Sequence, residues 1–216
     1  MIYVIGIGPG HRSYILPKAI ETIKQCDIVI GAKRNLDSVR EDCRQILELK
    51  NNFNEIKNYM IKHSDQIIGV IVSGDTGFYS MLNYIKRHID QENIEVIPGI
   101  SSLQYMFSKM KIGYEDTKWT SYHAREGIAF SEMASGLIEG MTFGLLTDAA
   151  HSPEGIRKEL LKVIEARKNS FSLESITLTI GERLSYDDER ITKQSIIQPL
   201  NKAIDPLCVM VIRDEG

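Results

Sequence analysis

Short apolar runs alternate with amphipathic segments along the first half of the chain. The apolar runs are rich in β-branched residues, which is typical of strands buried on both faces of a parallel sheet. Strands are predicted at residues 2–7, 27–31, 46–49, 67–73 and 94–97. Apolar positions at helical spacing predict helices at residues 16–23, 32–40, 53–63, 81–89 and 103–110. The alternation predicts a parallel or mostly parallel sheet with helices on both faces.

The second half of the chain has longer apolar runs and fewer helices. Strands are predicted at residues 119–123, 141–147, 175–181 and 207–213, and helices at residues 130–137 and 153–166. The highly charged residues 184–192 are predicted to form a turn-rich excursion. This pattern predicts a mixed sheet with antiparallel pairs. We place the domain boundary in the polar segment 111–118, which gives an N-terminal α/β domain at residues 1–112 and a C-terminal α/β domain at residues 117–216.

Net charge limits the expected binding partners, and cysteine content indicates the cellular compartment. The formal net charge is −3, so nothing draws the whole chain to nucleic acid or to an anionic membrane. No apolar run reaches the ~18 residues of a membrane span, and the first residues lack the basic segment of a signal peptide. The cysteines, Cys26, Cys43 and Cys208, are scattered along the chain, which favours reduced structural thiols. We therefore expect a cytoplasmic protein with no nucleic-acid or membrane partner.

Three of the predicted strands end in loops of small residues, at residues 8–10, 74–77 and 98–102. The carboxyl ends of parallel strands share one edge of the sheet, and ligands bind at that edge. Glycines there allow sharp turns and close approach of a ligand to the backbone, and Asp75 offers a carboxylate to hydroxyls or a cation. The alternative is a plain strand-to-helix turn in which Asp75 or Thr76 caps the helix. Ser101 and Ser102 have the same two interpretations.

Familiar signatures for other chemistry are missing from the sequence. The dinucleotide fingerprint GxGxxG fails because His11 occupies the place of its third glycine, and no GxxxxGK[ST] motif occurs. No cluster of histidine, cysteine and carboxylate residues has the spacing of metal ligands, and no GxSxG nucleophile elbow is present. The three loops therefore favour group transfer from a bound cofactor, without a metal.

Polar clusters follow three predicted strands of the second half. His123 and Arg125 could bind carboxylates, and His123 could accept a proton near neutral pH. The alternative for this pair is a solvated strand end. Residues 146–148, Leu-Thr-Asp, end the next strand, and the charged residues 182–190 follow another, with a solvated hairpin as the alternative for that segment.

The ordered motifs of the chain resemble those of the tetrapyrrole methylase family, whose members use S-adenosylmethionine. The motifs that carry this resemblance are Gly6-Ile7-Gly8-Pro9-Gly10, Ser73-Gly74-Asp75-Thr76-Gly77-Phe78-Tyr79 and Pro98-Gly99-Ile100-Ser101-Ser102. Residues 121–125, 146–148 and 182–191 resemble the branch that methylates C5 of a precorrin in cobalamin synthesis. The resemblance covers essentially the whole chain. Three positions depart from it, because Thr76 and Asp187 replace a usual proline and Ala124 replaces a common glycine.

The resemblance implies two α/β domains with S-adenosylmethionine in the cleft between them, and a homodimer. It implies methylation of C5 of cobalt-precorrin-7, or of its metal-free counterpart, with S-adenosylhomocysteine as the other product. The cofactor-binding residues that it implies are Gly8, Pro9, Gly74, Asp75, Thr76, Ser101, Ser102, Leu146 and Leu184. His123 and Arg125 are the catalytic candidates. Candidates for binding the carboxylates of the substrate are Arg12, Lys33, Arg34, Arg125 and Arg183.

Some relatives fuse this module to a second methyltransferase that acts at C15 and removes a carboxyl group. The chain ends at Gly216 without that module, so we expect C15 methylation to need a separate protein. Other interpretations remain open at this point. The same fold could methylate another tetrapyrrole carbon, a protein side chain or ribosomal RNA, or it could bind S-adenosylmethionine as a regulator without chemistry.

Overall fold

The computed structural model describes residues 1–50, 53–123, 125–167 and 172–216. These residues form two compact units, Met1–Ser102 and Leu103–Gly216. Each unit is built around its own five-stranded sheet.

The sheet of the first unit is parallel throughout. Its strands lie in the order β3-β2-β4-β1-β5, and each strand pairs in parallel with its neighbours. The strands are β1 (Ile2–Gly6), β2 (Ile28–Gly31), β3 (Ile46–Glu48), β4 (Ile68–Val72) and β5 (Ile94–Ile97). This arrangement confirms the parallel sheet that the apolar runs predict, and it places the carboxyl ends of β2, β4, β1 and β5 side by side along one edge.

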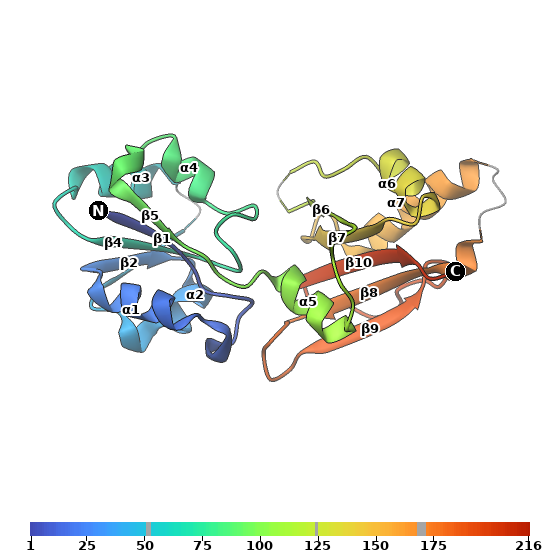
Figure 1. The fold of residues 1–216 in the computed structure, drawn as a ribbon, viewed down its shortest axis with the longest axis horizontal. Helices are drawn as coiled ribbons and strands as arrows, with labels where there is room; N and C mark the ends of the chain where they lie inside the picture. Colours follow the sequence, from blue (N-terminus) through green and yellow to red (C-terminus); the bar gives the residue numbers. More distant parts are fainter. Residues whose placement is uncertain (51–52, 124, 168–171) are drawn as a thin grey trace. The chain divides into compact units, whose positions relative to one another are not determined.

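Helices cover both faces of this sheet, with α1 and α2 on one side and α3 and α4 on the other (Figure 1). They are α1 (Pro17–Gln25), α2 (Lys33–Asp37), α3 (Phe53–Lys62) and α4 (Leu82–Lys86), with short 3-10 turns at Arg12–Tyr14, Arg40–Asp42 and Gln91–Asn93. Alternate residues of β1 serve the two cores, because Ile5 packs with Ala19 and Ile23 of α1 whereas Val4 packs with Ile56 of α3. Burial on both faces explains why the strand is apolar at nearly every position.

The second unit is built on a mixed sheet of order β6-β7-β10-β8-β9. Only the β6–β7 pair is parallel among its described strands, and the other three pairs are antiparallel, which confirms the predicted mixed sheet. Its strands and helices are α5 (Ser102–Met110), β6 (Thr117–Ser121), α6 (Phe130–Ile138), β7 (Thr142–Leu146), α7 (Pro153–Ala166), β8 (Ile176–Glu182), β9 (Arg190–Ser195) and β10 (Cys208–Asp214), with a 3-10 turn at Leu173–Ser175.

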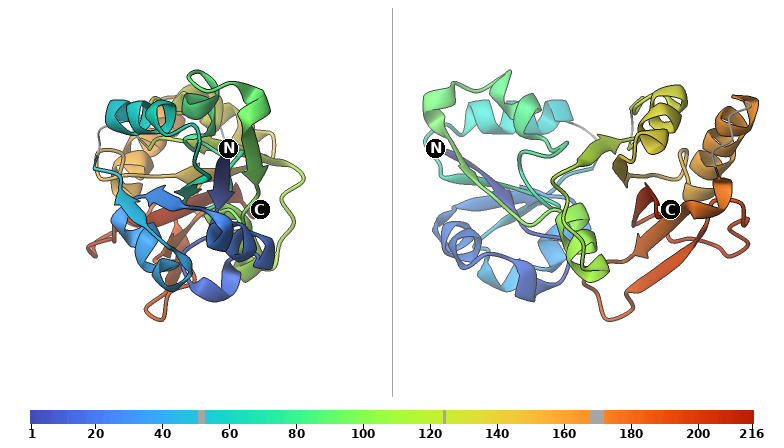
Figure 2. Two further views of the ribbon diagram at one scale, coloured as in Figure 1. Left: turned by 90° about the vertical axis from the view of Figure 1, so that its left-hand side faces the viewer. Right: turned by 45° about the vertical axis from the view of Figure 1, so that its right-hand side comes forward.

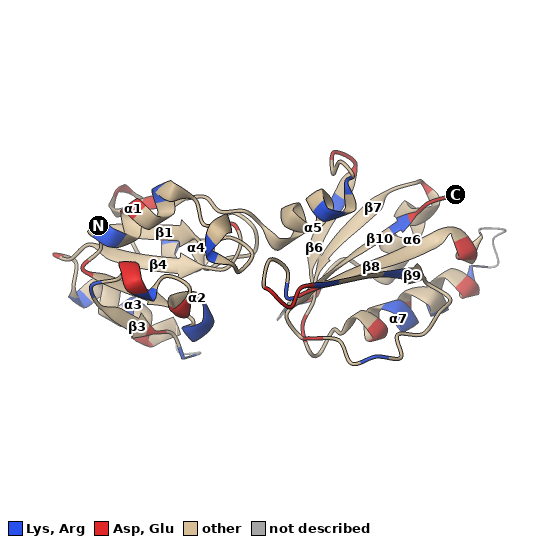
Figure 3. Cartoon of the chain, turned by 90° about the horizontal axis from the view of Figure 1, so that it is seen from below, with Lys and Arg blue, Asp and Glu red and all other residues tan. Residues whose placement is uncertain are grey.

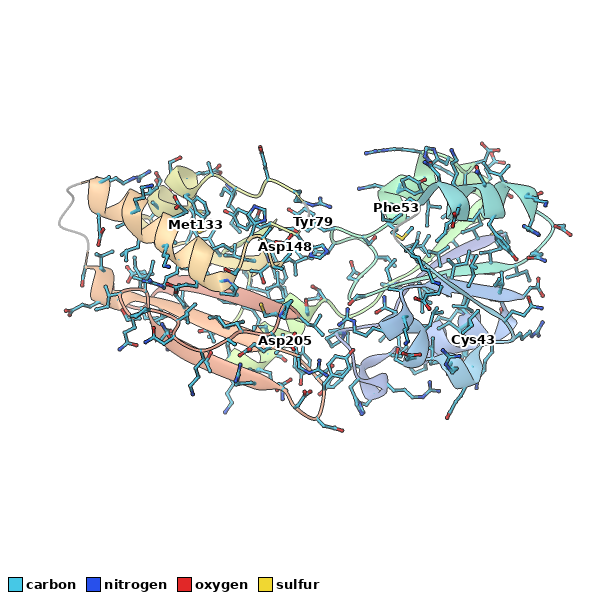
Figure 4. The ribbon with its side chains drawn as sticks, turned by 180° about the vertical axis from the view of Figure 1, so that it is seen from behind. Cys43, Phe53, Tyr79, Met133, Asp148 and Asp205 are labelled. Carbon is cyan, nitrogen blue, oxygen red and sulfur yellow. The ribbon has the colours of Figure 1, made fainter. Side chains whose placement is uncertain are left out.

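Helices α6 and α7 lie side by side on one face of this sheet (Figure 2). Met133 of α6, labelled in Figure 4, and Leu160 of α7 are fully buried in one core with Phe143 and Leu178 of the strands. The solvent-facing side of α7 carries acidic and basic residues (Figure 3), which include the pair Lys158–Glu154 at 3.7 Å. The helix is therefore amphipathic in the way that its sequence spacing predicts.

Helix α5 packs on the opposite face of the same sheet. Its Leu103 and Phe107 side chains lie 3.4 and 3.5 Å from where a Cβ atom of Gly144 would be, and the Phe107 ring stacks on Trp119 with centroids 5.6 Å apart. These contacts place α5 in the second unit. The polar segment 111–118, at which we placed the boundary from sequence, therefore lies inside the second unit, and the division falls before α5.

Strand β9 is absent from the predicted elements, because residues 190–195 lie partly in the predicted charged excursion. The structure pairs them with β8 in an antiparallel hairpin at the edge of the sheet. Most of β9 is exposed, and Lys and Arg occupy it (Figure 3). Charged residues are common on edge strands because they discourage pairing with other chains, so the alternation of apolar and polar residues that reveals inner strands is missing here.

We expect the thiols to be nearly inert in the folded protein. All three cysteines are free, and Cys43, labelled in Figure 4, is half-buried whereas the other two are buried. Burial raises the pKa of Cys26 to about 12 and that of Cys43 to about 11, and it also raises the pKa of Cys208. Since the thiolate is the reactive form, a disulfide reagent at pH 8 should label the native chain about 100-fold more slowly than the urea-unfolded chain. Rapid labelling of the native chain would contradict this burial.

Candidate functional site

Two of the three glycine loops meet at a short backbone bridge. Beyond the ends of β1 and β4, the Gly8 amide donates to the Gly74 carbonyl at 3.2 Å, and the Gly74 amide donates to the Gly8 carbonyl at 2.8 Å. Gly8 has a φ of 77° and Gly74 a φ of 70°, values that residues with a Cβ atom rarely adopt. The chain can therefore turn sharply at both positions and still form this bridge.

The third loop touches the other two through its backbone. A Cβ atom on Gly99 would lie 2.2 Å from the Gly74 carbonyl oxygen, and one on Gly6 would lie 2.6 Å from the Gly99 amide nitrogen. Both distances are far below ordinary contact, so this close approach requires glycine. The structure thus brings together the ends of β4, β1 and β5, as the strand order along the edge of the sheet allows.

Asp75 ties two of these loops together. Its Oδ1 atom accepts a hydrogen bond from the Gly77 amide at 2.8 Å, and its Oδ2 atom accepts one from the Gly99 amide at 3.2 Å. Helix capping, the alternative interpretation from sequence, is not what Asp75 or Thr76 does, because α4 begins only at Leu82 and has no side-chain cap. Each carboxylate oxygen keeps a second lone pair, so Asp75 can hold the loops and still accept a hydrogen bond from a ligand.

The three loops meet at Gly8, Gly74 and Gly99, which we call the glycine junction. The remaining candidates of the first unit lie beside it. Pro9 and Thr76 are buried, as is Ser101. The Ser101 Cα atom lies 3.6 Å from where a Cβ atom of Gly74 would be. Ser102 is half-buried at the start of α5. The seven candidates on this edge of the sheet, whose cofactor role stays a prediction, are Gly8, Pro9, Gly74, Asp75, Thr76, Ser101 and Ser102.

In the second unit, the candidate catalytic residues follow β6 in an exposed turn. The His123 amide donates to the Ser121 hydroxyl at 3.2 Å, and Arg125 Nε donates to the His123 carbonyl at 3.4 Å. Both side chains are exposed, and Ala124 between them lies outside the described residues. The turn stands next to the end of β7, because the Tyr122 amide donates to the Leu146 carbonyl at 2.9 Å.

An aspartate–histidine pair that the sequence analysis did not single out follows β7. Asp148, labelled in Figure 4, accepts hydrogen bonds through Oδ1 from the His151 amide at 2.7 Å and makes a 3.2 Å contact with His151 Nδ1. The His151 ring lies 5.7 Å from the Tyr122 ring. The spacing Asp-x-x-His directly before Ser152, which caps α7, is the sequence signal that could have revealed this pair.

Leu184 lies in a tightly constrained turn after β8. Arg183 and Ser185, its neighbours, both have positive φ angles, of 48° and 70°. The Ser185 amide donates to Glu189 Oε2 at 2.7 Å, and Arg183 Nε donates to Asp188 at 2.5 Å. Leu184 itself is buried. Residues of this segment pair both within it, as Arg183 does with Asp188, and outside it, as Glu189 does with Lys109 of α5 at 3.1 Å. The segment joins β8 to β9 as a hairpin, and the cofactor role of Leu146 and Leu184 stays a prediction.

A buried carboxylate anchors the same hairpin. Glu182 accepts hydrogen bonds from Arg190 Nε at 2.6 Å and from the amide of Asp205, labelled in Figure 4, at 2.8 Å. Burial alone would raise the pKa of Glu182, but the hydrogen bonds from Arg190 and Asp205 outweigh it, and the pKa lies below its ordinary value. The ionised form is therefore the one that the fold stabilises.

This pairing predicts acid sensitivity. Because the pKa of Glu182 is lowered on folding, its contribution to stability is complete above the unfolded pKa of about 4.3 and is lost as the pH falls through the folded value. We expect Glu182→Gln to lower stability at pH 7 and to make the unfolding midpoint less dependent on pH below about pH 5. Urea titrations at several pH values measure both effects. Glu165→Gln, at an exposed position of α7, should keep the wild-type slope, and an equal slope in Glu182→Gln would contradict the argument.

The described residues lack both a metal-ligand cluster and a membrane-spanning helix. No group of three or more histidine, cysteine, aspartate or glutamate residues in that part of the chain is arranged to hold a metal ion. No helix within the same residues has the length and apolar character that crossing a membrane requires.

Sequence similarity connects the chain to one protein family. The family model of the tetrapyrrole (corrin/porphyrin) methylases matches residues 1–198. A cobalt-precorrin-7 C(5)-methyltransferase of Salmonella typhimurium is 30% identical over 191 residues, which are 88% of this chain and 89% of that protein. A probable cobalt-precorrin-7 C(5)-methyltransferase of Methanocaldococcus jannaschii is 39% identical over 133 residues, which are 58% of this chain and 62% of that protein.

Solved structures share the fold. A precorrin-6Y methylase from Archaeoglobus fulgidus superposes with a TM-score of 0.73 at 19% identity, over 100% of this chain and 99% of that one. A uroporphyrin-III C-methyl transferase from Thermus thermophilus, complexed with S-adenyl homocysteine, gives a TM-score of 0.76 at 16% identity, over 98% and 96% of the two chains. Together with the match of the family model over most of the sequence, these likenesses show that the chain belongs to the tetrapyrrole (corrin/porphyrin) methylase family.

Proposed function

We propose that this chain transfers a methyl group from S-adenosylmethionine to C5 of cobalt-precorrin-7, or of its metal-free counterpart, in cobalamin synthesis. The observation that carries the proposal is the similarity to the Salmonella typhimurium enzyme of that name, which extends over nearly nine tenths of both chains. The glycine junction supports it, because a ligand-binding edge built of close backbone contacts suits a bound cofactor.

The residues of this edge fit S-adenosylmethionine. Gly77 leaves the loop open, because Asp75 Oδ1, at 3.1 Å, is the only described atom beyond its chain neighbours within 4 Å of where a Cβ atom would be. Asp75 retains acceptor capacity for the hydroxyl or amino groups of the cofactor. We assign cofactor binding in the first unit to Gly8, Pro9, Gly74, Asp75, Thr76, Ser101 and Ser102, and in the second unit to Leu146 and Leu184.

Methyl transfer depends mainly on how the chain positions the methyl group and the acceptor carbon. S-adenosylmethionine supplies a methyl group on a sulfonium, which is already activated for transfer. The chain has to align the acceptor carbon with that methyl group and to exclude water. The two hydrogen bonds of Asp75 keep the loops in one arrangement for this purpose. His123 would accept the proton that the macrocycle releases, and Arg125 would bind one of its carboxylates.

The decisive experiment uses the purified chain with cobalt-precorrin-7 and S-adenosylmethionine that carries a ¹³C-methyl group. Mass spectrometry should find a product heavier by one labelled methyl group, and NMR should place the new carbon at C5. An unchanged macrocycle beside tightly bound S-adenosylmethionine would overturn the C5 assignment. It would favour another acceptor or a regulator without chemistry.

Asp75 provides a separate prediction about the cofactor. Asp75→Asn keeps one acceptor oxygen but turns an amide donor toward the amide of Gly77 or Gly99, so we expect S-adenosylmethionine to bind about 30-fold more weakly. Asp75→Ala, which loses both hydrogen bonds, should bind it more weakly still. Isothermal titration calorimetry measures both affinities. Asp65→Asn, at an exposed position outside the loops, is the matched control, and wild-type affinity in Asp75→Asn would remove Asp75 from the site.

Three further expectations go with this function. The chain would form a homodimer, which sedimentation measurements can test. It would work in the cytoplasm, and methylation and decarboxylation at C15 would be the task of a separate protein. Adding that protein to the reaction should extend the product by a second methyl group and remove a carboxyl group from it.

A further inference from the structure

We propose that Arg34, with Lys33 beside it, binds a carboxylate of the tetrapyrrole substrate and so selects for a polycarboxylate acceptor. This inference rests on the proposed function and adds a recognition residue to it. It starts from two exposed cations at the edge of the sheet where the glycine loops meet.

The fold places Arg34 beside the cofactor loop of β4. Strand β2 ends at Gly31 and runs parallel to β4, which ends at Val72, so the residues that follow both strands share one edge. Arg34 Nη2 lies 3.4 Å from the hydroxyl oxygen of Ser73. Since Ser73 directly precedes Gly74, the guanidinium group lies next to the glycine junction and within the same unit.

No carboxylate among the described residues pairs with Arg34, whereas Arg12 and Arg183 are both paired. Arg12 forms a 2.6 Å ion pair with Asp42, and Arg183 forms a 2.5 Å pair with Asp188. Asp37 on the same helix as Arg34 is paired with Arg40 at 3.1 Å.

Among the residues that the structure describes, neither Lys33 nor Arg34 forms an ion pair with a carboxylate. The partner of Arg34 is a neutral hydroxyl at a long distance, which leaves most of its donors available to a ligand.

The chemistry of an arginine in this position suits a carboxylate. A guanidinium presents a rigid fork of donors that can hold both oxygens of a carboxylate at once, whereas a lysine acts as a point charge. A substrate carboxylate bound there would fix one side of the macrocycle beside the loops that we assign to the cofactor. Lys33 would add attraction without fixing orientation. Recognition by Arg34 should therefore depend on charge and on geometry.

The test compares Arg34→Ala and Arg34→Lys with the wild type, using Arg87→Ala as the control. Arg87 is an exposed arginine of the same unit that follows α4. We expect Arg34→Ala to raise the KM for cobalt-precorrin-7 about tenfold, with kcat and the Kd of S-adenosylmethionine changed less than about twofold. Arg34→Lys should recover part of the loss. In the wild type the KM should rise between 50 and 300 mM NaCl, and in Arg34→Ala it should rise less.

Binding measured without turnover separates this inference from the proposed function. Uroporphyrin III, an octacarboxylate tetrapyrrole, serves as the probe in a fluorescence titration at low salt. Weaker binding to Arg34→Ala than to the wild type and Arg87→Ala supports the inference even if no methyl group reaches C5. Equal KM and equal probe affinity in Arg34→Ala and the wild type overturn it, even if the wild type methylates C5 as proposed. Failure of the wild type to bind either tetrapyrrole while it binds S-adenosylmethionine overturns it as well.

Discussion

Replacing Gly99 with alanine is expected to unfold much of the first unit and to abolish cofactor binding. The new Cβ atom would lie 2.2 Å from the Gly74 carbonyl oxygen and 2.7 Å from the Gly6 carbonyl carbon. Both neighbours are backbone atoms, so no side chain can rotate away, and the loops must separate. We expect a loss of about 3 kcal/mol or more in unfolding free energy and an S-adenosylmethionine affinity at least about 100-fold lower. Thermal melts and calorimetry measure these two effects.

Gly140 offers a matched control for this substitution. It also has a positive φ, of 80°, but apart from its chain neighbours no atom of the described residues lies within 4 Å of the Cβ atom that alanine would add. Gly140→Ala should therefore cost only the backbone strain, about 1 kcal/mol, and leave cofactor binding unchanged. If Gly99→Ala were as stable as Gly140→Ala, the close packing of the three loops would be wrong.

Replacing Arg157 with methionine is expected to destabilise the second unit by about 3 kcal/mol. Arg157 is buried on α7, where Nε and Nη2 donate to Glu154 at 2.7 and 2.8 Å and Nη1 donates to the Ile196 carbonyl at 2.9 Å. Glu154 also accepts from the Leu200 amide at 3.0 Å. Methionine fills similar space but leaves the carboxylate and the carbonyl without these partners. Urea denaturation of the full chain, followed by circular dichroism, measures the loss.

The control for Arg157 is its neighbour Lys158. That side chain is largely exposed and lies 3.7 Å from the same carboxylate, so Lys158→Met should change stability little. Similar losses in the two variants would show that the ionic contact to Glu154 matters and the burial of Arg157 does not.

The elements that could be predicted from sequence are those whose burial leaves a pattern. Strands β1, β2 and β4 are buried on both faces, so their apolar runs identify them and their parallel pairing. Strand β9 has no such pattern because it is an exposed edge strand. The apolar face of α5 predicts a helix correctly, but periodicity does not say which sheet that face covers. Its contact with Gly144 and Trp119 emerges only in three dimensions.

Some features of the candidate site could likewise be predicted from sequence, and others could not. Gly8, Gly74 and Gly99 stand in recognisable loops, and their convergence follows from parallel strands that end at one edge. That Asp75 binds the Gly99 amide, 24 residues further along the chain, could not be predicted, because the contact depends on the register of the strands. The ion pairs of Arg12 and Arg183 could not be predicted from sequence either, because tertiary structure determines their partners.

The bridge between Gly8 and Gly74 has a consequence for how the protein responds to its surroundings. The groups that form it are main-chain amides and carbonyls, which do not titrate between about pH 5 and pH 9 and carry no net charge. The bridge itself should therefore be nearly indifferent to pH and ionic strength over that range. Capture of a polyanionic macrocycle by exposed cations would weaken as salt rises. A rise in salt would then loosen the hold on the macrocycle and leave the bridge between the two loops intact.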